Sequence, residues 1–327
     1  MSVNTLSDPP FFPVPNVTAS PIPQVNGSTM PLVGLIDTAI SPDFLGAPLP
    51  SRRECSAGAQ SSNILSDKIG VGDRPTHGDR MLQLLQPLGT VGISTVWLGA
   101  TVGSGRWAES LAEFVAAVEA RGCSPAVINL SFDLIWRYPD GRIRPRQGLS
   151  PAEYRAIAQA QRAGVVLVVA AGNDGGGLTG LAQAAAQFDN ICVVGAAEGN
   201  AIAPYSSRGV HLSILAEGTA EGHSGTSIAA ARVSAAVAQL WAANSALSYR
   251  QVLHILRATA TPCPNGPDGS DTSDGSDNSY GSDGSGDGAI AASPLRAFTR
   301  PVGHLNLSAA LSQAIAPTLH LRHWAHL

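Results

Sequence analysis

Short apolar segments alternate with segments of helical periodicity along this chain. The apolar segments are mostly closed by Gly, Asn or Asp, as buried strands often are. Strands separated by helices usually pair in parallel, so the alternation predicts an α/β fold with a mostly parallel, buried central sheet flanked by helices. The five predicted strands span residues 32–36, 95–98, 126–130, 165–170 and 191–195.

Several of the segments between the predicted strands show the capping pattern or the periodicity of a helix. Ser150–Glu153 is a capping-box pattern with proline at the first helical position, which predicts a helix to about residue 162. Ser248–Gln251 is a second capping box and predicts a helix to about residue 258. Residues 107–120 carry apolar side chains every three or four positions, as a helix packed on a sheet does. Residues 302–316 resume the apolar pattern and predict a final strand and helix.

Residues 264–288 interrupt the pattern. They are almost entirely Gly, Ser, Asp and Asn, with six aspartates, no basic residue and Tyr280 as the one large apolar side chain. Such a segment buries too little surface to order itself, so we expect a solvated insertion. Calcium binding by the aspartates is an alternative, although the aliphatic positions of a calcium-binding β-roll are absent. The predicted organisation is an N-terminal extension at 1–30, a folded domain at 31–316 that contains the insertion, and a C-terminal tail at 317–327.

Composition and charge narrow the classes of protein. The chain has 327 residues, of which 44% are hydrophobic and 13% charged, which is enough apolar material for a large core. The formal net charge is −4 and the basic residues, almost all Arg, are scattered, which disfavours nucleic acid and anionic membranes as partners. No apolar run approaches the roughly 20 residues that span a bilayer. No signal peptide is recognised either, so we expect a cytoplasmic location.

The spacing of the cysteines also fits a reducing compartment such as the cytoplasm. Cys55, Cys123, Cys192 and Cys263 have no CxxC spacing, so a disulfide or zinc framework is not expected. The sequence therefore predicts no metal site and requires no cofactor.

Four polar residues lie at the ends of these segments, where open α/β sheets build their sites. Asp37 directly follows the first strand, where it could simply cap a turn. His77 opens an apolar helix, and the dipole at a helix N-terminus disfavours the imidazolium form. We therefore expect a neutral histidine that can accept a proton, with a structural role as the alternative.

Asn173 and Ser227 are the other two. Asn173 follows the strand at 165–170 through two small residues, and it either holds a turn or donates a hydrogen bond to a developing oxyanion. Ser227 begins an Ala-rich helix that runs to about residue 243. It is either a helix cap or a nucleophile whose own backbone N–H faces the substrate oxygen.

Together these residues fill the four roles of serine hydrolysis, which are nucleophile, base, orienting carboxylate and oxyanion donor. Their chain order is Asp, His, Asn, Ser. With its flanking residues, this order resembles the subtilisin-like serine proteases, or subtilases, over about residues 32–259 and again at 303–311. The most specific motif is Gly225-Thr226-Ser227-x-Ala229; the supporting motifs are Ala171-Gly172-Asn173, His77-Gly78, Val127-Ile128-Asn129-Leu130-Ser131 and Tyr205-Ser206-Ser207-Arg208-Gly209.

The resemblance implies a three-layer subtilisin-like fold and a serine endopeptidase that acts on protein or peptide substrates through an acyl-enzyme. By the same resemblance Asp37 orients His77, and His77 takes the proton from Ser227. Asn173 and the Ser227 amide then hold the oxyanion. The implied pocket for the side chain before the cleaved bond is lined by Leu130, Ser131, Phe132, Asp133, Ala170, Ala171 and Gly172.

Some residues depart from the family pattern. Ala39 replaces the glycine usual after Asp-Thr, and Asp79 replaces the threonine common after His-Gly. Ala231-Arg232 stands where Pro-His is usual. None of these changes removes a catalytic atom. Asp133 occupies a position where the family usually has glycine, so it would place a carboxylate near the pocket rim, where it either attracts a cationic substrate residue or is simply solvated.

Three other functions are compatible with parts of this pattern. Gly222–Gly225 begins like the nucleophile elbow of an α/β-hydrolase, but Thr226 stands in place of the closing glycine. A non-catalytic binding protein on the same fold would normally have lost a triad residue, and none is lost here. A peptide ligase or macrocyclase shares the acyl-enzyme step and differs only in whether an amine or water resolves it, so the sequence leaves it open.

Overall fold

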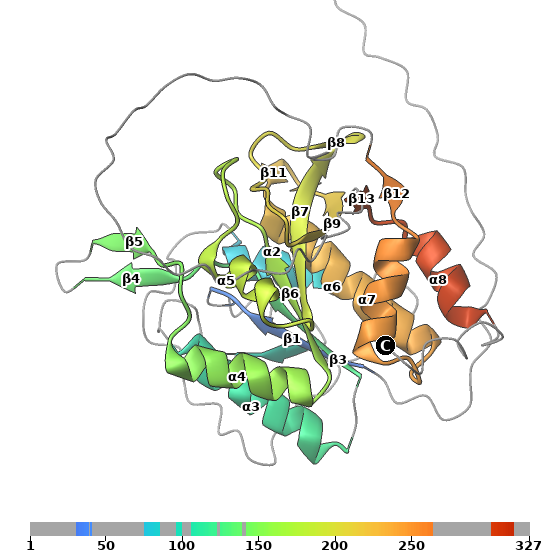
Figure 1. The fold of residues 1–327 in the computed structure, drawn as a ribbon, viewed down its shortest axis with the longest axis horizontal. Helices are drawn as coiled ribbons and strands as arrows, with labels where there is room; N and C mark the ends of the chain where they lie inside the picture. Colours follow the sequence, from blue (N-terminus) through green and yellow to red (C-terminus); the bar gives the residue numbers. More distant parts are fainter. Residues whose placement is uncertain are drawn as a thin grey trace, which may run out of the picture.

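The apolar segments predicted as strands form a contiguous run that ends at one edge of a nine-stranded sheet, ordered β12-β13-β9-β7-β6-β3-β1-β2, with β8 paired to β7 (Figure 1). The computed structural model describes residues 31–38, 40, 75–85, 96–99, 106–122, 125–138, 142–263 and 302–316. The strands of this sheet are β1 (Leu32–Ile36), β2 (Val96–Leu98), β3 (Ala126–Leu130), β6 (Val165–Ala170), β7 (Ile191–Glu198), β8 (Ala201–Ile202), β9 (Leu212–Glu217), β12 (Thr261–Pro262) and β13 (Gly303–His304).

Most neighbours in this sheet run parallel, as the alternation of strands and helices predicts. From β2 through β1, β3, β6, β7 and β9 to β13 every pairing is parallel. The two antiparallel pairings, β12 with β13 and β7 with β8, lie toward one end of the strand order. The predicted α/β fold with a mostly parallel central sheet is confirmed.

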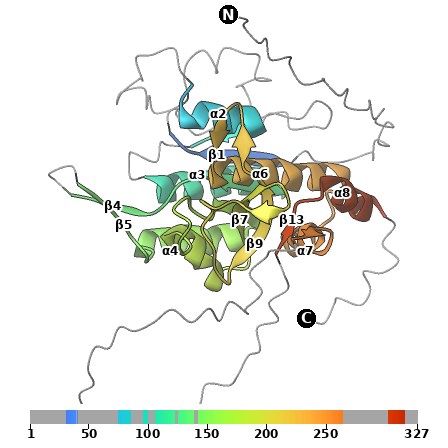
Figure 2. The same cartoon turned by 90° about the horizontal axis from the view of Figure 1, so that it is seen from above.

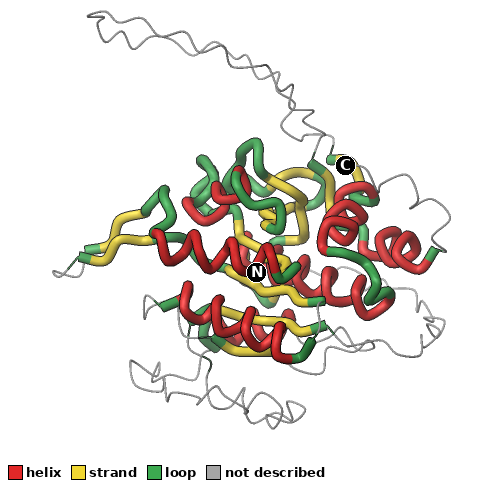
Figure 3. The backbone as a smooth tube through the Cα atoms, turned by 60° about the horizontal axis from the view of Figure 1, so that its bottom comes forward, coloured by secondary structure: helices red, strands yellow, loops and turns green. Residues whose placement is uncertain are grey.

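Helices cover both faces of the sheet, so the fold has three layers. Figure 2 shows α2 and α4 on opposite sides, and in Figure 3 the strands run between the helices. One face packs on α2 (His77–Leu85), α6 (Thr226–Ala243), α7 (Tyr249–Ala258) and α8 (Leu307–Ile315). The other packs on α3 (Trp107–Ala120), α4 (Pro151–Arg162) and the short α5 (Gly180–Gln183), which continues into a 3-10 turn at Ala184–Ala186.

Side-chain alternation along β6 explains why two separate cores form. Val166, Val168 and Ala170 belong to the cluster beneath α6, whereas the alternate residues belong to the cluster beneath α3 and α4. These alternate residues are Val165, Leu167 and Val169. Successive side chains of a strand point to opposite faces, so a continuous apolar run is what a strand covered on both faces requires.

The helix α6 is central to the first of these layers. It packs against β3, β6, β7 and β9, and fourteen of its eighteen residues are buried. Its alanines have no side chain beyond Cβ, so the helix can lie close to the sheet along its whole length. The predicted Ala-rich helix ending near residue 243 is confirmed.

Helix starts agree with the capping patterns. Reciprocal hydrogen bonds of a capping box join Ser150 to Glu153 and Ser248 to Gln251. The predicted helix at 107–120 and the final strand and helix, β13 and α8, are also present.

The sequence pattern does not predict every element. Two short antiparallel hairpins lie outside the main sheet, β4 (Ile135–Arg137) with β5 (Ile143–Pro145) and β10 (Thr219–Ala220) with β11 (His223–Ser224). Their strands are two or three residues long, too short for a periodicity to be read. The proposed insertion at 264–288, the extension at 1–30 and the tail at 317–327 lie outside the described residues.

In the part of the chain that the structure describes, no helix is long and apolar enough to cross a membrane. The same part holds no group of three His, Cys, Asp or Glu side chains arranged for a metal ion. Cys192 and Cys263 are buried free thiols, and burial raises the pKa of Cys192 to about 11.

Candidate active site

The polar residues singled out above follow neighbouring strands of the sheet. Asp37 follows β1, Ser131 follows β3, and Gly172 and Asn173 follow β6. The strands are in parallel register, with Ile36 opposite Leu130 and Leu130 opposite Val169. Because parallel strands end at the same edge, their carboxyl ends bring these residues to one edge of the sheet.

Asp37 and His77 form the clearest contact of the site. His77 Nδ1 lies 2.6 Å from Asp37 Oδ1, and that oxygen also accepts the backbone N–H of Thr38 at 2.7 Å. The Asp37 side chain is 2% exposed and the imidazole 37%. An ionised carboxylate only accepts hydrogen bonds, so the Nδ1 that it holds carries the proton and Nε2 is left as the acceptor.

Two features place the imidazole at the start of α2. Thr76 and Asp79 cap the helix reciprocally: Thr76 N–H donates to Asp79 Oδ2 at 2.8 Å, and Asp79 N–H donates to Thr76 Oγ1 at 3.1 Å. Gly78 N–H donates to Thr38 Oγ1, and a Cβ added at Gly78 would lie 2.5 Å from the Thr38 carbonyl oxygen. The helix can approach β1 this closely only with glycine after His77.

Asn173 is held by the residue that precedes Ser227. Its Oδ1 accepts the Thr226 N–H at 2.8 Å and the Thr226 hydroxyl at 3.0 Å. With the oxygen so occupied, the Nδ2 amide is left, and within the described residues it makes no hydrogen bond. Gly172 before it has φ +118°, and a Cβ there would lie 2.6 Å from Ser207 Oγ, so this turn requires glycine.

Ser227 lies in the first turn of α6 and is 8% exposed. No protein acceptor for its backbone N–H is recorded among the described residues, as is usual for the first amides of a helix. Its carbonyl oxygen accepts the Ser131 hydroxyl at 3.4 Å. Ser224, the other serine of this motif, is exposed on β11.

The two halves of the site meet through packing. Met81 and Leu82 of α2 share a core cluster with Ile228 of α6, and the two helices pack against each other. Between His77 and Ser227, both of which the structure describes, no hydrogen bond is recorded. The structure thus brings Asp37 to His77, and Asn173 to the start of α6.

The residues predicted to line a substrate pocket lie at the same edge of the sheet, but several of their side chains pack in the core or bind other parts of the protein. Leu130 and Ala171 are fully buried, and their side chains belong to the core cluster beneath α3 and α4. Phe132 packs edge-on against Trp107, with ring centroids 5.6 Å apart. Asp133 Oδ1 accepts the N–H groups of Leu134 and, across 47 residues, Gly180. Ser131, Ala170 and Gly172 complete the set.

A buried polar network behind Ser131 is a feature that the sequence pattern does not assign to the site. Asn129 Nδ2 donates to Ser131 Oγ at 2.9 Å, and Ser234 of α6 donates to Asn129 Oδ1 at 3.1 Å. Asn129 and Ser234 are fully buried. An asparagine inside an otherwise apolar strand is the sequence signal that could have identified it.

A hollow between α2 and the start of α6 also has no sequence signal. Glu221, whose φ of +49° is unusual for a residue other than glycine, lies in its wall. The lining residues are Arg80, Gln83, Leu84, Ala220, Glu221 and Ile228.

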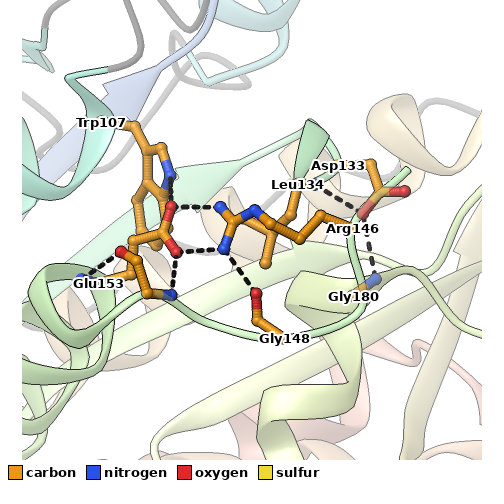
Figure 4. Close-up of polar contacts among 8 residues, drawn as sticks. Trp107, Asp133, Leu134, Arg146, Gly148, Glu153 and Gly180 are labelled. Carbon is orange, nitrogen blue, oxygen red and sulfur yellow. Dashed lines mark hydrogen bonds and ion pairs between the residues drawn. The ribbon is translucent and has the colours of Figure 1, made fainter. Parts of the chain in front are cut away.

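Two carboxylates fasten the base of the β4–β5 hairpin beside this edge (Figure 4). Asp133 ties the start of the hairpin to α5, and burial raises the pKa of its carboxyl even though backbone hydrogen bonds oppose that shift. At the other end the Arg146 guanidinium binds both Glu153 oxygens, at 2.7 and 2.5 Å. Glu153 also accepts the Trp107 indole N–H and the Ser150 N–H.

This buried pair predicts a pH-dependent contribution to stability. Burial alone would raise the pKa of Glu153, but the hydrogen bonds and charge of Arg146, with the Ser150 N–H, outweigh it and the pKa lies below its ordinary value. The stabilisation is therefore fully present above the unfolded-state pKa of about 4.3 and is lost as pH falls through the lower folded-state pKa.

We expect Glu153→Gln to lower the free energy of unfolding at pH 7 by about 3 kcal/mol, because it leaves the Arg146 charge without its partner. The difference from wild type, measured by urea unfolding, should shrink below about pH 4. Glu119→Gln on the exposed side of α3 is the control and should change little. An equal deficit at both pH values would assign the effect to packing and not to charge.

The family model described as "Subtilase family" matches residues 88–282, a range that contains Asn173 and Ser227 and begins after Asp37 and His77.

Several solved structures share the fold. A mutant of the protease domain of PatA is 19% identical, covers 89% of this chain and 98% of its own, and has a TM-score of 0.52. The patellamide maturation protease PatA is 20% identical, covers 87% of this chain and 96% of its own, and has a TM-score of 0.51. The prenylagaramide maturation protease PagA is 22% identical, covers 88% of this chain and 94% of its own, and has a TM-score of 0.51. At these identities the likeness is one of fold.

Proposed function

Because the chain belongs to the subtilase family and is a serine protease, we propose that it cleaves internal bonds of protein or peptide substrates with Asp37, His77 and Ser227 as its triad. The observation that carries the proposal is the 2.6 Å contact between the buried Asp37 carboxylate and His77 Nδ1. It fixes the proton on Nδ1 and leaves Nε2, on a partly exposed ring, ready to act as a base.

In the proposed reaction, Ser227 Oγ attacks the carbonyl carbon of the scissile bond while His77 Nε2 accepts the hydroxyl proton. The tetrahedral intermediate collapses to an acyl-enzyme as the imidazolium gives that proton to the leaving amine. Water then attacks the ester by the same two steps, which releases the new carboxylate and restores Ser227. Catalytic hydrogen bonds are often long without substrate, so the Ser227 to His77 bond is expected to form when substrate binds.

The oxyanion is proposed to lie between two donors that are otherwise unused, Asn173 Nδ2 and the Ser227 backbone N–H. Thr226 supports this arrangement because its N–H and hydroxyl hold Asn173 Oδ1, which leaves the amide nitrogen as the remaining donor of this side chain. Donors fixed in advance stabilise the developing charge without reorganising.

Asn173→Ala should lower kcat with little change in KM. Loss of the corresponding asparagine of subtilisin costs about 100- to 1,000-fold in turnover, and we expect the same order here. Asn173→Asp is the matched variant, because it keeps the acceptor for Thr226 and loses the amide donor. If both variants keep full kcat, Asn173 takes no part in stabilising the oxyanion.

For the substrate, we propose that an extended peptide lies along the backbone after β3 and after β6, with Ser131–Asp133 on one side and Ala170–Gly172 on the other. This edge is partly accessible, since Phe132, Asp133 and Gly172 are half-buried and Asn173 is exposed. Asp133 would meet a cationic substrate residue with Oδ2, because its recorded hydrogen bonds use Oδ1.

The test is cleavage of an unstructured peptide in water enriched in ¹⁸O, followed by mass spectrometry. Hydrolysis should give two linear fragments, with one ¹⁸O in the new carboxylate. A cyclic or lengthened product without label would instead identify a ligase that resolves the acyl-enzyme with an amine. Intact peptide in every condition would contradict the proposal.

A further inference from the structure

The β4–β5 hairpin projects from the body of the molecule beside the proposed substrate edge (Figures 1 and 3). Among the described residues it pairs only with itself. Trp136 lies opposite Arg144, and the Tyr138 N–H donates to the Arg142 carbonyl oxygen at 2.9 Å. Opposite and alternate residues of an antiparallel pair share a face. Trp136, Tyr138, Arg142 and Arg144 therefore lie on one face, called the hairpin face below.

The hairpin face combines exposed aromatic rings with guanidinium groups. Trp136 is 58% and Tyr138 37% exposed, and both arginines are exposed. Arg142 lies over the Tyr138 ring at 5.4 Å from its centroid, and Arg146, at the base, lies over Trp136 at 5.2 Å. Large exposed aromatic side chains among arginines are typical of binding surfaces.

The charge of the hairpin face favours a negatively charged partner. The hairpin sequence 133–147 carries four arginines and two aspartates. Asp133 lies at the base, where its Oδ1 accepts the Leu134 and Gly180 N–H groups, and Asp140 lies outside the described residues. Arg146 is paired with Glu153, whereas for the Arg144 guanidinium no acidic partner is recorded among the described residues. The face is thus positive, and guanidinium groups bind carboxylates in a bidentate manner.

The hairpin is also held in place before any partner arrives. A two-stranded hairpin alone is marginally stable. Here Asp133 fastens its first strand to α5, and Arg146 fastens its second strand to α4 through Glu153 (Figure 4). A partner therefore binds a formed surface and spends little free energy in ordering it.

Its base is close to the proposed nucleophile. Ser131, which contacts the Ser227 carbonyl, is followed after four residues by Ile135. Four residues span at most about 14 Å. A substrate bound at Ser131 can therefore reach the hairpin with a segment that lies only several residues from the cleaved bond.

We propose that the hairpin face binds an acidic, extended segment of the substrate and so adds a specificity site to the protease. This inference rests on the proposed function. Substrate carboxylates pair with Arg144, Arg142 adds positive charge to the same face, and apolar side chains of the substrate pack on Trp136 and Tyr138. Because the pairs are solvent-exposed, their effect weakens as salt rises.

The test compares two peptides with the same cleaved sequence. One carries four Asp or Glu residues several positions from the bond, and the other carries Asn or Gln there. Wild type should show a kcat/KM for the acidic peptide about 3- to 10-fold higher at low salt, the order that exposed charge pairing supplies. The double variant Arg142→Gln/Arg144→Gln and Trp136→Ala should each lose most of this preference while cleaving the neutral peptide as wild type does.

Arg155→Gln, an exposed arginine of α4, is the matched charge control and should keep the preference. Equal cleavage of both peptides by wild type, or a preference that survives in the double variant, overturns the proposal. A preference that appears only after residues 264–288 are deleted also overturns it for the intact chain, because that acidic segment would then be the occupant.

If neither peptide is cleaved, the proposed function fails, and the hairpin face is tested separately by binding. Fluorescence anisotropy of the labelled acidic peptide should report binding to wild type that weakens several-fold in the double variant. Equal binding to both proteins would overturn the proposal without any reference to catalysis.

Discussion

Ser227→Ala should abolish covalent labelling by a fluorophosphonate probe and lower peptide turnover by a factor on the order of a million, the loss known for removal of the nucleophile of subtilisin. The probe phosphorylates an activated hydroxyl, and alanine has none. Ser227 is the one serine of its motif that lies in the first turn of α6, next to the residue that holds Asn173.

Ser224→Ala is the matched control. Ser224 lies three residues earlier, exposed on β11 and outside the helix, so this variant should keep most of its labelling and turnover. Labelling that survives in Ser227→Ala but disappears in Ser224→Ala would move the nucleophile to the hairpin and contradict the proposed mechanism.

Asp37→Asn should lower kcat by about 10,000-fold while leaving the fold intact. An asparagine at this place can donate its amide N–H to His77 Nδ1, which favours the tautomer that carries its proton on Nε2. That tautomer cannot accept the Ser227 proton. The variant also removes the charge that stabilises the imidazolium.

Asp79→Asn provides the comparison, since Asp79 is a second buried carboxylate of the same region whose side chain caps α2 at Thr76. We expect this variant to change the melting temperature more than kcat. Steady-state kinetics of both variants, with circular dichroism to check folding, decides the matter. A loss of less than tenfold in Asp37→Asn would remove Asp37 from the triad.

The parts of the fold that the sequence predicts are those set by local chemistry. The capping boxes at Ser150 and Ser248 need only residues three positions apart, and the strands need only an apolar run between turn residues. Asp79 is instructive here, because the sequence marks it as a departure from the family pattern. Its role becomes clear only when the reciprocal bonds with Thr76 are seen.

Long-range contacts explain what the sequence does not predict. The β4–β5 hairpin depends on Asp133 reaching Gly180 and on Arg146 reaching Glu153 in the next helix, and neither contact leaves a periodicity. Likewise, the predicted pocket residue Leu130 sits in the core because β3 is covered on both faces, which a motif match cannot reveal. The role of Asp133 as an anchor could not be predicted either, because its partner Gly180 lies 47 residues away in the sequence.

The dense packing of α6 has a consequence for how this protein can evolve or be engineered. Ala229, Ala230 and Ala231, which follow Ser227 and Ile228, are fully buried, so even one added methyl group there meets neighbouring atoms of the core. Overpacking of this kind typically costs about 1 to 3 kcal/mol and shifts the backbone, which here carries the proposed nucleophile. Substitutions that change selectivity should therefore destabilise the fold least on protruding surfaces. Libraries that vary such a surface and keep the alanine helix constant should retain the largest share of active enzymes.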